Sequence, residues 1–326
     1  MIQHKFKRKI LIWQLTNRGF GSEINNLLYA INYSSKKKYE LDLETSSWNF
    51  RIKDGWNDYF LSIDSSKNKN FSKFLLILIN KFIGISSIIY YDKSVNMKFK
   101  SNASNIKITT RFKFHIYILL KKIFLFLKPK GKYFIFEKFY EVRKFCLLER
   151  NLNKKKFILN IHEILINLWK FKEGINLQIQ NKKIQIEEDY AVFHIRRGDK
   201  IETQEDNYYN VKDYVKYFNA LNTDINTIFI MGDDYSVFTE LNEKFPNYNF
   251  LTLIDSEEDG HLQSDFNKKN NTKKEIAALN LLTEIEIARD CEVFIGSQKS
   301  NIFRLIEYFK INDCHDISDG TCEYII

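Results

Sequence analysis

The sequence is poor in the residues that mark several classes of protein. It has two prolines and eleven glycines among 326 residues, which excludes collagen-like and other low-complexity classes. Its four cysteines are too few for a disulfide scaffold of this length, and no two of them form a Cys-x-x-Cys pair. The spacing of Cys314, His315 and Cys322 matches no common zinc pattern, so we expect no metal site.

Long uninterrupted apolar runs are also missing. Segments 71–91 and 112–127 are apolar but contain lysines, whereas a membrane-spanning helix needs about 20 mostly apolar residues. We therefore expect buried or amphipathic helices there. The short apolar run after the basic residues 1–8 lacks the length and cleavage site of a signal peptide. These features predict a cytoplasmic protein and leave a peripheral contact with a membrane surface open.

Hydrophobic residues make up 44% of the chain and aromatic residues 15%, which is enough for well-packed cores. The length predicts about two domains. The net charge is +9, but the lysines are spread, with short runs at 36–38 and 154–156. No nucleic-acid-binding motif accompanies them, so we expect no nucleic-acid partner. Binding of nucleic acid through charge alone is the least favoured alternative.

One stretch organises the rest of the chain, namely residues 190–200, Tyr-Ala-Val-Phe-His-Ile-Arg-Arg-Gly-Asp-Lys. Its apolar beginning is typical of a buried strand. Arg196 and Arg197 follow, and adjacent side chains at a strand end point to opposite faces, so one arginine can face a ligand. Asp199 can hold a guanidinium in a bidentate pair, and Gly198 permits a sharp turn. The pattern predicts a site for an anion such as a diphosphate.

The C-terminal half alternates strands with helices, which predicts a parallel, doubly wound sheet. Polar residues follow several of these strands, and the carboxyl ends of parallel strands meet at one edge, where ligands bind. The strands are expected at 190–193, 226–231, 249–253 and 292–295, and the helices at 211–221, at 235–245, from 271 onwards and at 301–309.

The N-terminal half begins with an expected strand at 9–14, a glycine turn at 17–22 and a helix at 23–35, an order that can present backbone N–H groups to an anion. A strand follows at 39–43. Trp48 and Trp56 either pack in the core or form a platform for a sugar or base. The middle of the chain is mostly helical by pattern, with helices expected at 71–83, 112–127, 137–152 and 158–171.

The string His194-x-Arg196-Arg197-x-Asp199 resembles the signature of α1,2-, α1,6- and protein O-fucosyltransferases. The wider sequence resembles the α1,6-fucosyltransferase family, which includes eukaryotic core fucosyltransferases and rhizobial chitooligosaccharide fucosyltransferases. The order and approximate spacing of several segments agree, whereas residues 62–185 match poorly. The matching segments are 19–22, 41–48, 55–56, 194–200, 232–234, 245–250 and 284–304.

This resemblance implies a GT-B-like α/β fold, with two Rossmann-like domains and a cleft between them. We expect an N-terminal α/β domain with a helical insert on the acceptor side, residues 1–180, and a C-terminal domain that binds the GDP-sugar, residues 181–326. The resemblance implies GDP-fucose as donor, inversion, no metal or other cofactor, and an oligosaccharide or glycoconjugate acceptor, with α1,6 transfer to a GlcNAc-like sugar favoured. An α1,2- or protein O-fucosyltransferase is the alternative. The oligomeric state is not predicted.

The family's pattern also implies roles for individual residues. Arg196 would bind the β-phosphate and act in catalysis, while His194 and Glu284 would hold the nucleoside. Glu284 stands where the family has aspartate. Asp233 and Asp234 would contact the donor or order its loop. The full expected donor site is Gly19, Phe20, Gly21, Ser22, His194, Arg196, Arg197, Asp199, Tyr214, Asp233, Asp234, Glu284, Ser297, Ser300 and Asn301.

An inverting transfer also needs a general base. In the family this base is a glutamate four positions after the lysine matched by Lys200, but here that position is Gln204. Glu202 and Glu205 flank it, and we favour Glu205 as the base, with Lys200 as its relay partner. Because of Gln204, a catalytically inactive protein that binds a GDP-sugar or a glycan is a further alternative.

Overall fold

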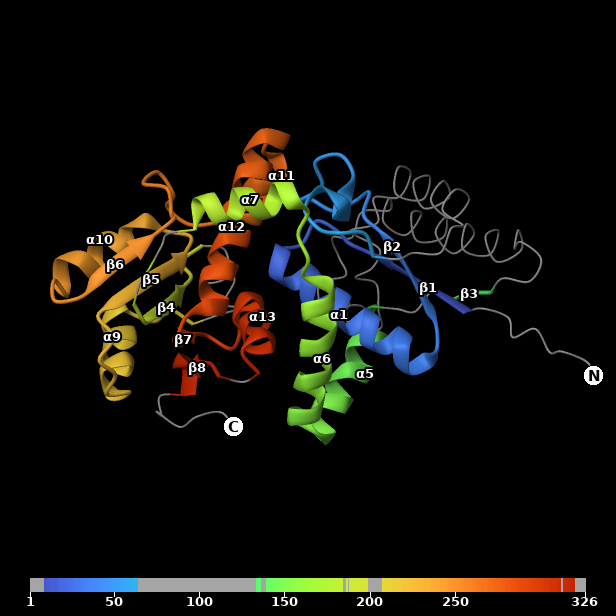
Figure 1. The fold of residues 1–326 in the computed structure, drawn as a ribbon, viewed down its shortest axis with the longest axis horizontal. Coiled ribbons are helices and arrows are strands. Elements are labelled where there is room, and N and C mark those ends of the chain that lie inside the picture. The colour runs from blue at the N-terminus through green and yellow to red at the C-terminus, as the bar shows by residue number, and fades with distance from the viewer. Residues whose placement is uncertain are drawn as a thin grey trace, which may run out of the picture. The chain divides into compact units, whose positions relative to one another are not determined.

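The computed structural model describes residues 9–63, 133–135, 139–183, 186, 188–198, 207–311 and 313–319. The chain forms two compact units (Figure 1). The N-terminal unit contains 1–17, 26–56 and 62–157, and the C-terminal unit contains 18–25, 57–61 and 158–326. The expected domain boundary near residue 180 stays a prediction. The helices expected at 71–83 and 112–127 lie outside the described residues.

The N-terminal unit contains a parallel sheet in the order β2-β1-β3. Its strands are β1 (Lys9–Gln14), β2 (Glu40–Glu44) and β3 (Tyr133–Ile135). Most of α1 (Phe20–Lys37), together with α5 (Phe139–Leu152) and the start of α6 (Lys154–Leu168), completes this unit. Leu11 of β1 and Leu27 and Leu28 of α1 are fully buried, as the apolar periodicity of both segments predicts.

Trp48 and Trp56 are both buried, with exposed fractions of 2% and 3%. Their rings stack on each other, with centroids 6.2 Å apart. The interpretation as a packed pair is therefore correct, and the interpretation as an open platform for a sugar or base is wrong for the described conformation.

The C-terminal unit contains a five-stranded parallel sheet in the order β6-β5-β4-β7-β8. The expected alternation of strands and helices is confirmed, with ends shifted by a residue or two. The structure adds α7, α11 and β8, which the sequence patterns did not predict. The elements are α7 (Glu173–Lys182), β4 (Tyr190–Ile195), α9 (Val211–Ala220), β5 (Thr227–Gly232), α10 (Tyr235–Lys244), β6 (Asn249–Thr252), α11 (Gln263–Lys268), α12 (Asn271–Asp290), β7 (Val293–Gly296), α13 (Asn301–Phe309) and β8 (His315–Asp316).

Within this unit, α9 and α10 cover one face of the sheet and α12 and α13 cover the other (Figure 1). Strand β4 lies in the middle and is buried along its whole length because both faces are covered. The chain runs outward from β4 through β5 to β6 on one side, and β7 and β8 lie on the other. The strand order therefore reverses beside β4, which makes the carboxyl end of β4 the switch point where doubly wound sheets bind ligands.

The helix expected at 23–35 begins earlier, at Phe20, and ends at Lys37. Phe20, Gly21 and Ser22 therefore form its first turn, and the turn expected at 17–22 is confined to residues 17–19. No helix among the described residues combines the length and the apolar character that crossing a bilayer requires.

Candidate functional site at the end of strand β4

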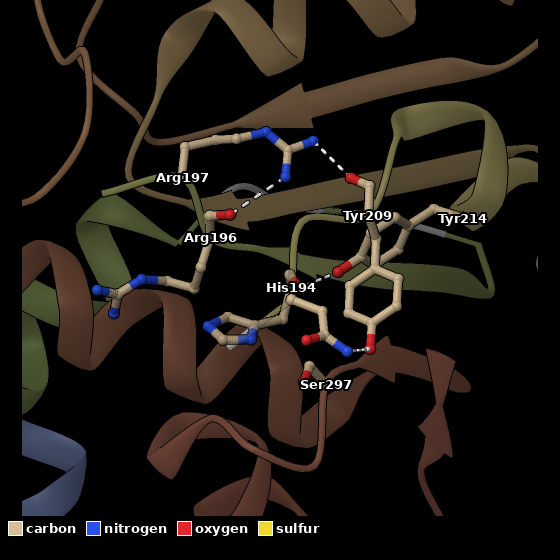
Figure 2. Close-up of a pocket in the computed structure, with 7 residues that line it drawn as sticks. His194, Arg196, Arg197, Tyr209, Tyr214 and Ser297 are labelled. Atoms are coloured by element: carbon tan, nitrogen blue, oxygen red, sulfur yellow. Dashed lines mark hydrogen bonds between the residues drawn. The ribbon is translucent and has the colours of Figure 1, made fainter. Parts of the chain in front are cut away.

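A pocket with an empty volume of about 220 Å³, open solvent included, lies at the carboxyl end of β4. Figure 2 shows its lining, which comes from the end of β4, the segment before α9, α9 itself and the residue after β7. Two loops that the sequence separates widely therefore meet at the switch point. The lining residues are His194, Arg196, Arg197, Asn207, Tyr209, Tyr214 and Ser297.

The buried carboxylate of Asp233, at the end of β5, organises the turn after β4. It accepts hydrogen bonds from the backbone N–H groups of Arg197 (2.8 Å) and Gly198 (3.3 Å), and from that of His261 (3.4 Å). Its Oδ2 also lies 2.9 Å from Nε of Arg196. One carboxylate thus holds the turn and positions its first guanidinium, because a buried charge is stable only when paired and hydrogen-bonded.

Gly198 allows this turn to pack against the loop that precedes α11. A methyl group on Gly198 would overlap the backbone of His261, which cannot move aside like the tip of a side chain. On the other side of the contact, Gly260 has φ +113°, a conformation that side chains rarely adopt. Glycine is therefore required at position 198 because the backbones of Gly198 and His261 approach each other closely.

Arg196 and Arg197 point apart in Figure 2, as the alternation of side chains predicts. Arg197 donates to the carbonyl oxygens of Arg196 (3.2 Å) and Tyr209 (2.8 Å). Its ζ-carbon lies 4.2 Å from the centre of the Tyr208 ring. Arg197 therefore ties the turn to the segment before α9, while Arg196 extends in the other direction.

His194 is 3% exposed, and its Nδ1 has no hydrogen-bond partner within the described part of the chain. Burial is the main cause that lowers the pKa of His194 to about 3, and the positive charge of Arg196 lowers it further. The negative charge of Asp233 raises this pKa, but its effect is smaller. The imidazole is therefore neutral at ordinary pH and can donate one hydrogen bond and accept another. A buried ring nitrogen without a partner at the edge of a pocket is suited to a ligand's polar edge.

Glu284, on α12, is 7% exposed, and its side chain forms no hydrogen bond or ion pair with another described residue. Burial, followed by the charges of Glu258 and Asp233, raises its pKa well above the ordinary range. Asp233 thus acts electrostatically on both His194 and Glu284. A ligand that carries N–H donors would favour the ionised form of this carboxyl group, which can then accept hydrogen bonds from those donors.

We expect Glu284→Gln to stabilise the protein at neutral pH. The carboxyl group of the unfolded chain titrates near pH 4.3, whereas that of the folded chain keeps its proton to higher pH. Above about pH 4.3 the unfolded state therefore binds fewer protons than the folded state, and the stability of the protein falls as pH rises. Glutamine removes this loss. Thermal unfolding from pH 4 to pH 8 should show a gain that grows with pH, at about 2–4 °C for each kcal/mol regained. A pH-independent gain would refute the titration argument.

The loop between β7 and α13 is held by a residue that the sequence patterns did not single out. Asp316 of β8, 2% exposed, accepts hydrogen bonds from the backbone of Gln298 (3.0 Å) and from the hydroxyl of Ser318 (2.7 Å). The hydroxyl of Ser297 accepts from the N–H of Lys299 (3.3 Å), and that of Ser300 caps α13. A lone aspartate in a two-residue strand carries no motif, so only its contacts identify it.

The first turn of α1 packs on the first turn of α13. The side-chain amide of Asn25 donates to the carbonyl oxygen of Asn301 (2.8 Å). A methyl group on Gly21 would come within 2.9 Å of Cδ1 of Ile302, so glycine permits this close approach. Two helix N-termini, whose free N–H groups favour anions, therefore lie side by side.

Two other predicted donor-site residues have structural contacts. Tyr214, 2% exposed, donates from its hydroxyl to the carbonyl oxygen of His194 (3.0 Å), which orients the end of β4. Asp234 caps α10 through the N–H of Ser236 (2.8 Å). That either residue also touches a donor stays a prediction. Outside the described residues lie Asp199, Lys200, Glu202, Gln204 and Glu205. No cluster suited to a metal ion occurs among the described residues.

Residues 148–286 match the family model described as alpha-(1,6)-fucosyltransferase N- and catalytic domains. This range includes the motif at 194–199, Asp233 and Glu284. The resemblance to α1,6-fucosyltransferases is therefore confirmed for this part of the chain. No curated protein matches the sequence.

Solved structures of fucosyltransferases share the fold. NodZ from Bradyrhizobium is 12% identical, with a TM-score of 0.50 and a match that covers 92% of each chain. NodZ alpha-1,6-fucosyltransferase co-crystallized with GDP has the same identity and TM-score, over 93% of this chain and 92% of its own. A variant of Arabidopsis thaliana FUT1 in complex with GDP is 9% identical, with a TM-score of 0.50, over 94% of this chain and 70% of its own. At such identities the likeness shows the α/β fold with parallel sheets.

Proposed function

We propose that the chain is an inverting, metal-independent glycosyltransferase that moves fucose from GDP-fucose to a glycan acceptor. The observation that carries this proposal is the group of side chains around Asp233. Arg196 supplies a fixed cation, His194 supplies a buried ring nitrogen without a described partner, and Glu284 supplies a buried carboxyl group. A diphosphate needs a fixed cation such as Arg196. The edge of guanine, with its N–H donors and carbonyl oxygen, suits His194 and Glu284. The family match over the same residues supports this assignment.

Arg196 is proposed to bind the β-phosphate of the donor. As the bond to fucose breaks, the departing GDP gains negative charge, and a preorganised guanidinium stabilises that charge more than it stabilises the ground state. The ion pair with Asp233 fixes the guanidinium before the donor arrives. The N–H groups that open α13, and those of the first turn of α1, add donors that need no metal.

The acceptor is proposed to be a GlcNAc-like sugar that receives fucose in an α1,6 link, because the matched family model is of the α1,6 type. A GT-B arrangement, with a cleft between two Rossmann-like domains, is part of this proposal. Linkage analysis of the product separates it from an α1,2- or protein O-fucosyltransferase. A product with the α1,2 link, or fucose attached to a serine or threonine, would overturn the acceptor assignment and leave the donor assignment intact.

We expect Glu205→Gln to lower turnover by about 10²–10⁴-fold while leaving GDP binding unchanged, because a general base acts on the acceptor hydroxyl and not on the donor. The measurement is fucose transfer to an acceptor panel beside GDP titration. Glu202→Gln is the matched control and should retain turnover. If both variants keep full activity, neither glutamate is the base, and if the wild type binds GDP without any transfer, the inactive binding protein is the better description.

The experiment that tests the donor assignment is titration of the protein with GDP, UDP, ADP and inosine diphosphate in the presence of a chelator. We expect GDP to bind at least about tenfold more tightly than the others, because it alone combines the diphosphate with both N–H donors of guanine. Glu284→Ala should reduce the preference for GDP over inosine diphosphate, which lacks the amino group. Equal binding of all four nucleotides would overturn the nucleoside assignment.

A further inference from the structure

The outer side of α5 exposes three leucines. Leu147, Leu148 and Leu152 have exposed fractions of 39%, 53% and 86%. They lie close together because residues four apart share one side of a helix and neighbours flank it. The inner side of the same helix is buried through Val142 and Cys146. Scattered exposed leucines are ordinary, but three adjoining ones on one helix mark a surface that contacts something apolar.

Four exposed cations flank these leucines along the chain. Arg143 and Lys144 lie one turn before them on α5, and Lys155 and Lys156 lie in the first turn of α6. All four side chains are exposed, and none forms an ion pair with a described residue. The turn between the helices is short, and Asn153 caps α6 through the N–H of Lys156 (2.9 Å). The lysines therefore follow directly on the leucines.

The acidic groups of α5 do not neutralise this surface. Glu149 is directed toward α1, where it accepts a hydrogen bond from Asn32 (2.7 Å) and lies 3.9 Å from Nζ of Lys36. Glu141, the other acid of α5, lies three residues before Lys144, forms no ion pair with a described residue, and leaves the four cations in excess. The surface therefore combines apolar side chains with unneutralised positive charge, within one compact unit.

We propose that this surface, Arg143, Lys144, Leu147, Leu148, Leu152, Lys155 and Lys156, docks on an anionic lipid membrane. An amphipathic surface of this kind places its leucines among the acyl chains and its cations at the lipid phosphates. A second copy of the chain fits less well, because a two-fold contact would place the same four cations opposite one another. A nucleic acid would use the cations but leave the leucines in water.

The test is co-sedimentation of the full chain with vesicles of phosphatidylcholine and phosphatidylglycerol in equal amounts, compared with phosphatidylcholine alone. We expect binding to the anionic vesicles, weakened by salt, and little binding to the neutral ones. The double variants Leu148→Ser with Leu152→Ser, and Lys155→Gln with Lys156→Gln, should each weaken binding by about tenfold or more. Leu177→Ser on α7, where Leu177 is 61% exposed, is the matched control and should bind as the wild type does.

The proposal is overturned by absent binding, by equal binding to neutral vesicles, or by binding that both double variants retain. Sedimentation velocity should show that the leucine pair does not alter the size of the protein in solution. If that pair dissociates a dimer, a second copy covers the surface and the lipid assignment fails. Titration of each variant with GDP is independent of the vesicles, so a failure here is distinguishable from a failure of the donor assignment.

Discussion

Arg196→Ala should lower the release of GDP from GDP-fucose, with acceptor present, by about 10²–10³-fold, the usual cost of removing one preorganised donor to a developing negative charge. The affinity for GDP should fall by about tenfold to a hundredfold, because a charge-assisted hydrogen bond contributes about 1.5–3 kcal/mol. The larger effect on turnover follows because the leaving group carries more charge in the transition state than in the bound donor. Turnover measurements and calorimetric titration separate the two effects.

Two further variants make this result interpretable. Arg143→Ala removes the same charge from an exposed side chain that does not line the pocket, and it should change neither quantity in a solution free of vesicles. Arg196→Lys keeps the charge but loses the planar fork, so it should recover affinity only in part. If Arg196→Ala binds GDP as the wild type does, the motif is a structural ion pair and the donor assignment is wrong.

Asp233→Ala should impair turnover nearly as much as Arg196→Ala, although we expect its main action through the arginine. The substitution leaves the N–H groups of Arg197, Gly198 and His261 without their acceptor and releases the guanidinium of Arg196. A buried polar group without a partner costs about 1–3 kcal/mol, so denaturant unfolding should also show a loss of stability of at least that size.

Asp233→Asn keeps an acceptor for the backbone and removes the charge. We expect it to restore most of the stability and little of the turnover, because the arginine is then no longer fixed by an opposite charge. In the Arg196→Ala background, Asp233→Asn should add little further loss of GDP affinity, since two residues that act through one contact are not additive. Additive losses would show that Asp233 contacts the donor directly instead of positioning Arg196.

Much of the site followed from local patterns in the chain. The apolar run 190–193 predicted a buried strand, and the paired arginines after it predicted side chains that point apart. Both predictions are confirmed, because the period of a strand and its burial are properties of a few neighbouring residues. The alternation of strands and helices after residue 190 likewise predicted the parallel sheet.

The tertiary structure decided which role each of these residues has. Asp233 and Asp234 are adjacent and alike in sequence, yet one holds the turn after β4 and the other caps α10. Gly21 was expected in the turn before the helix, but it lies in the first turn of α1, where it permits close packing on α13. Asp316 supports the loop after β7 from a strand too short to predict.

The sequence by itself therefore determined most of the strands and helices and which residue types follow each strand. Helix and strand periods and turn residues act over a few positions, so the chain carries them locally. Only the tertiary structure decided that His194 keeps a buried ring nitrogen without a described partner and that Glu284 is buried, while Asp233 uses both oxygens. The hydrogen bonds of Asp233 join residues 28 to 36 positions apart, and their distances depend on packing that no local pattern encodes.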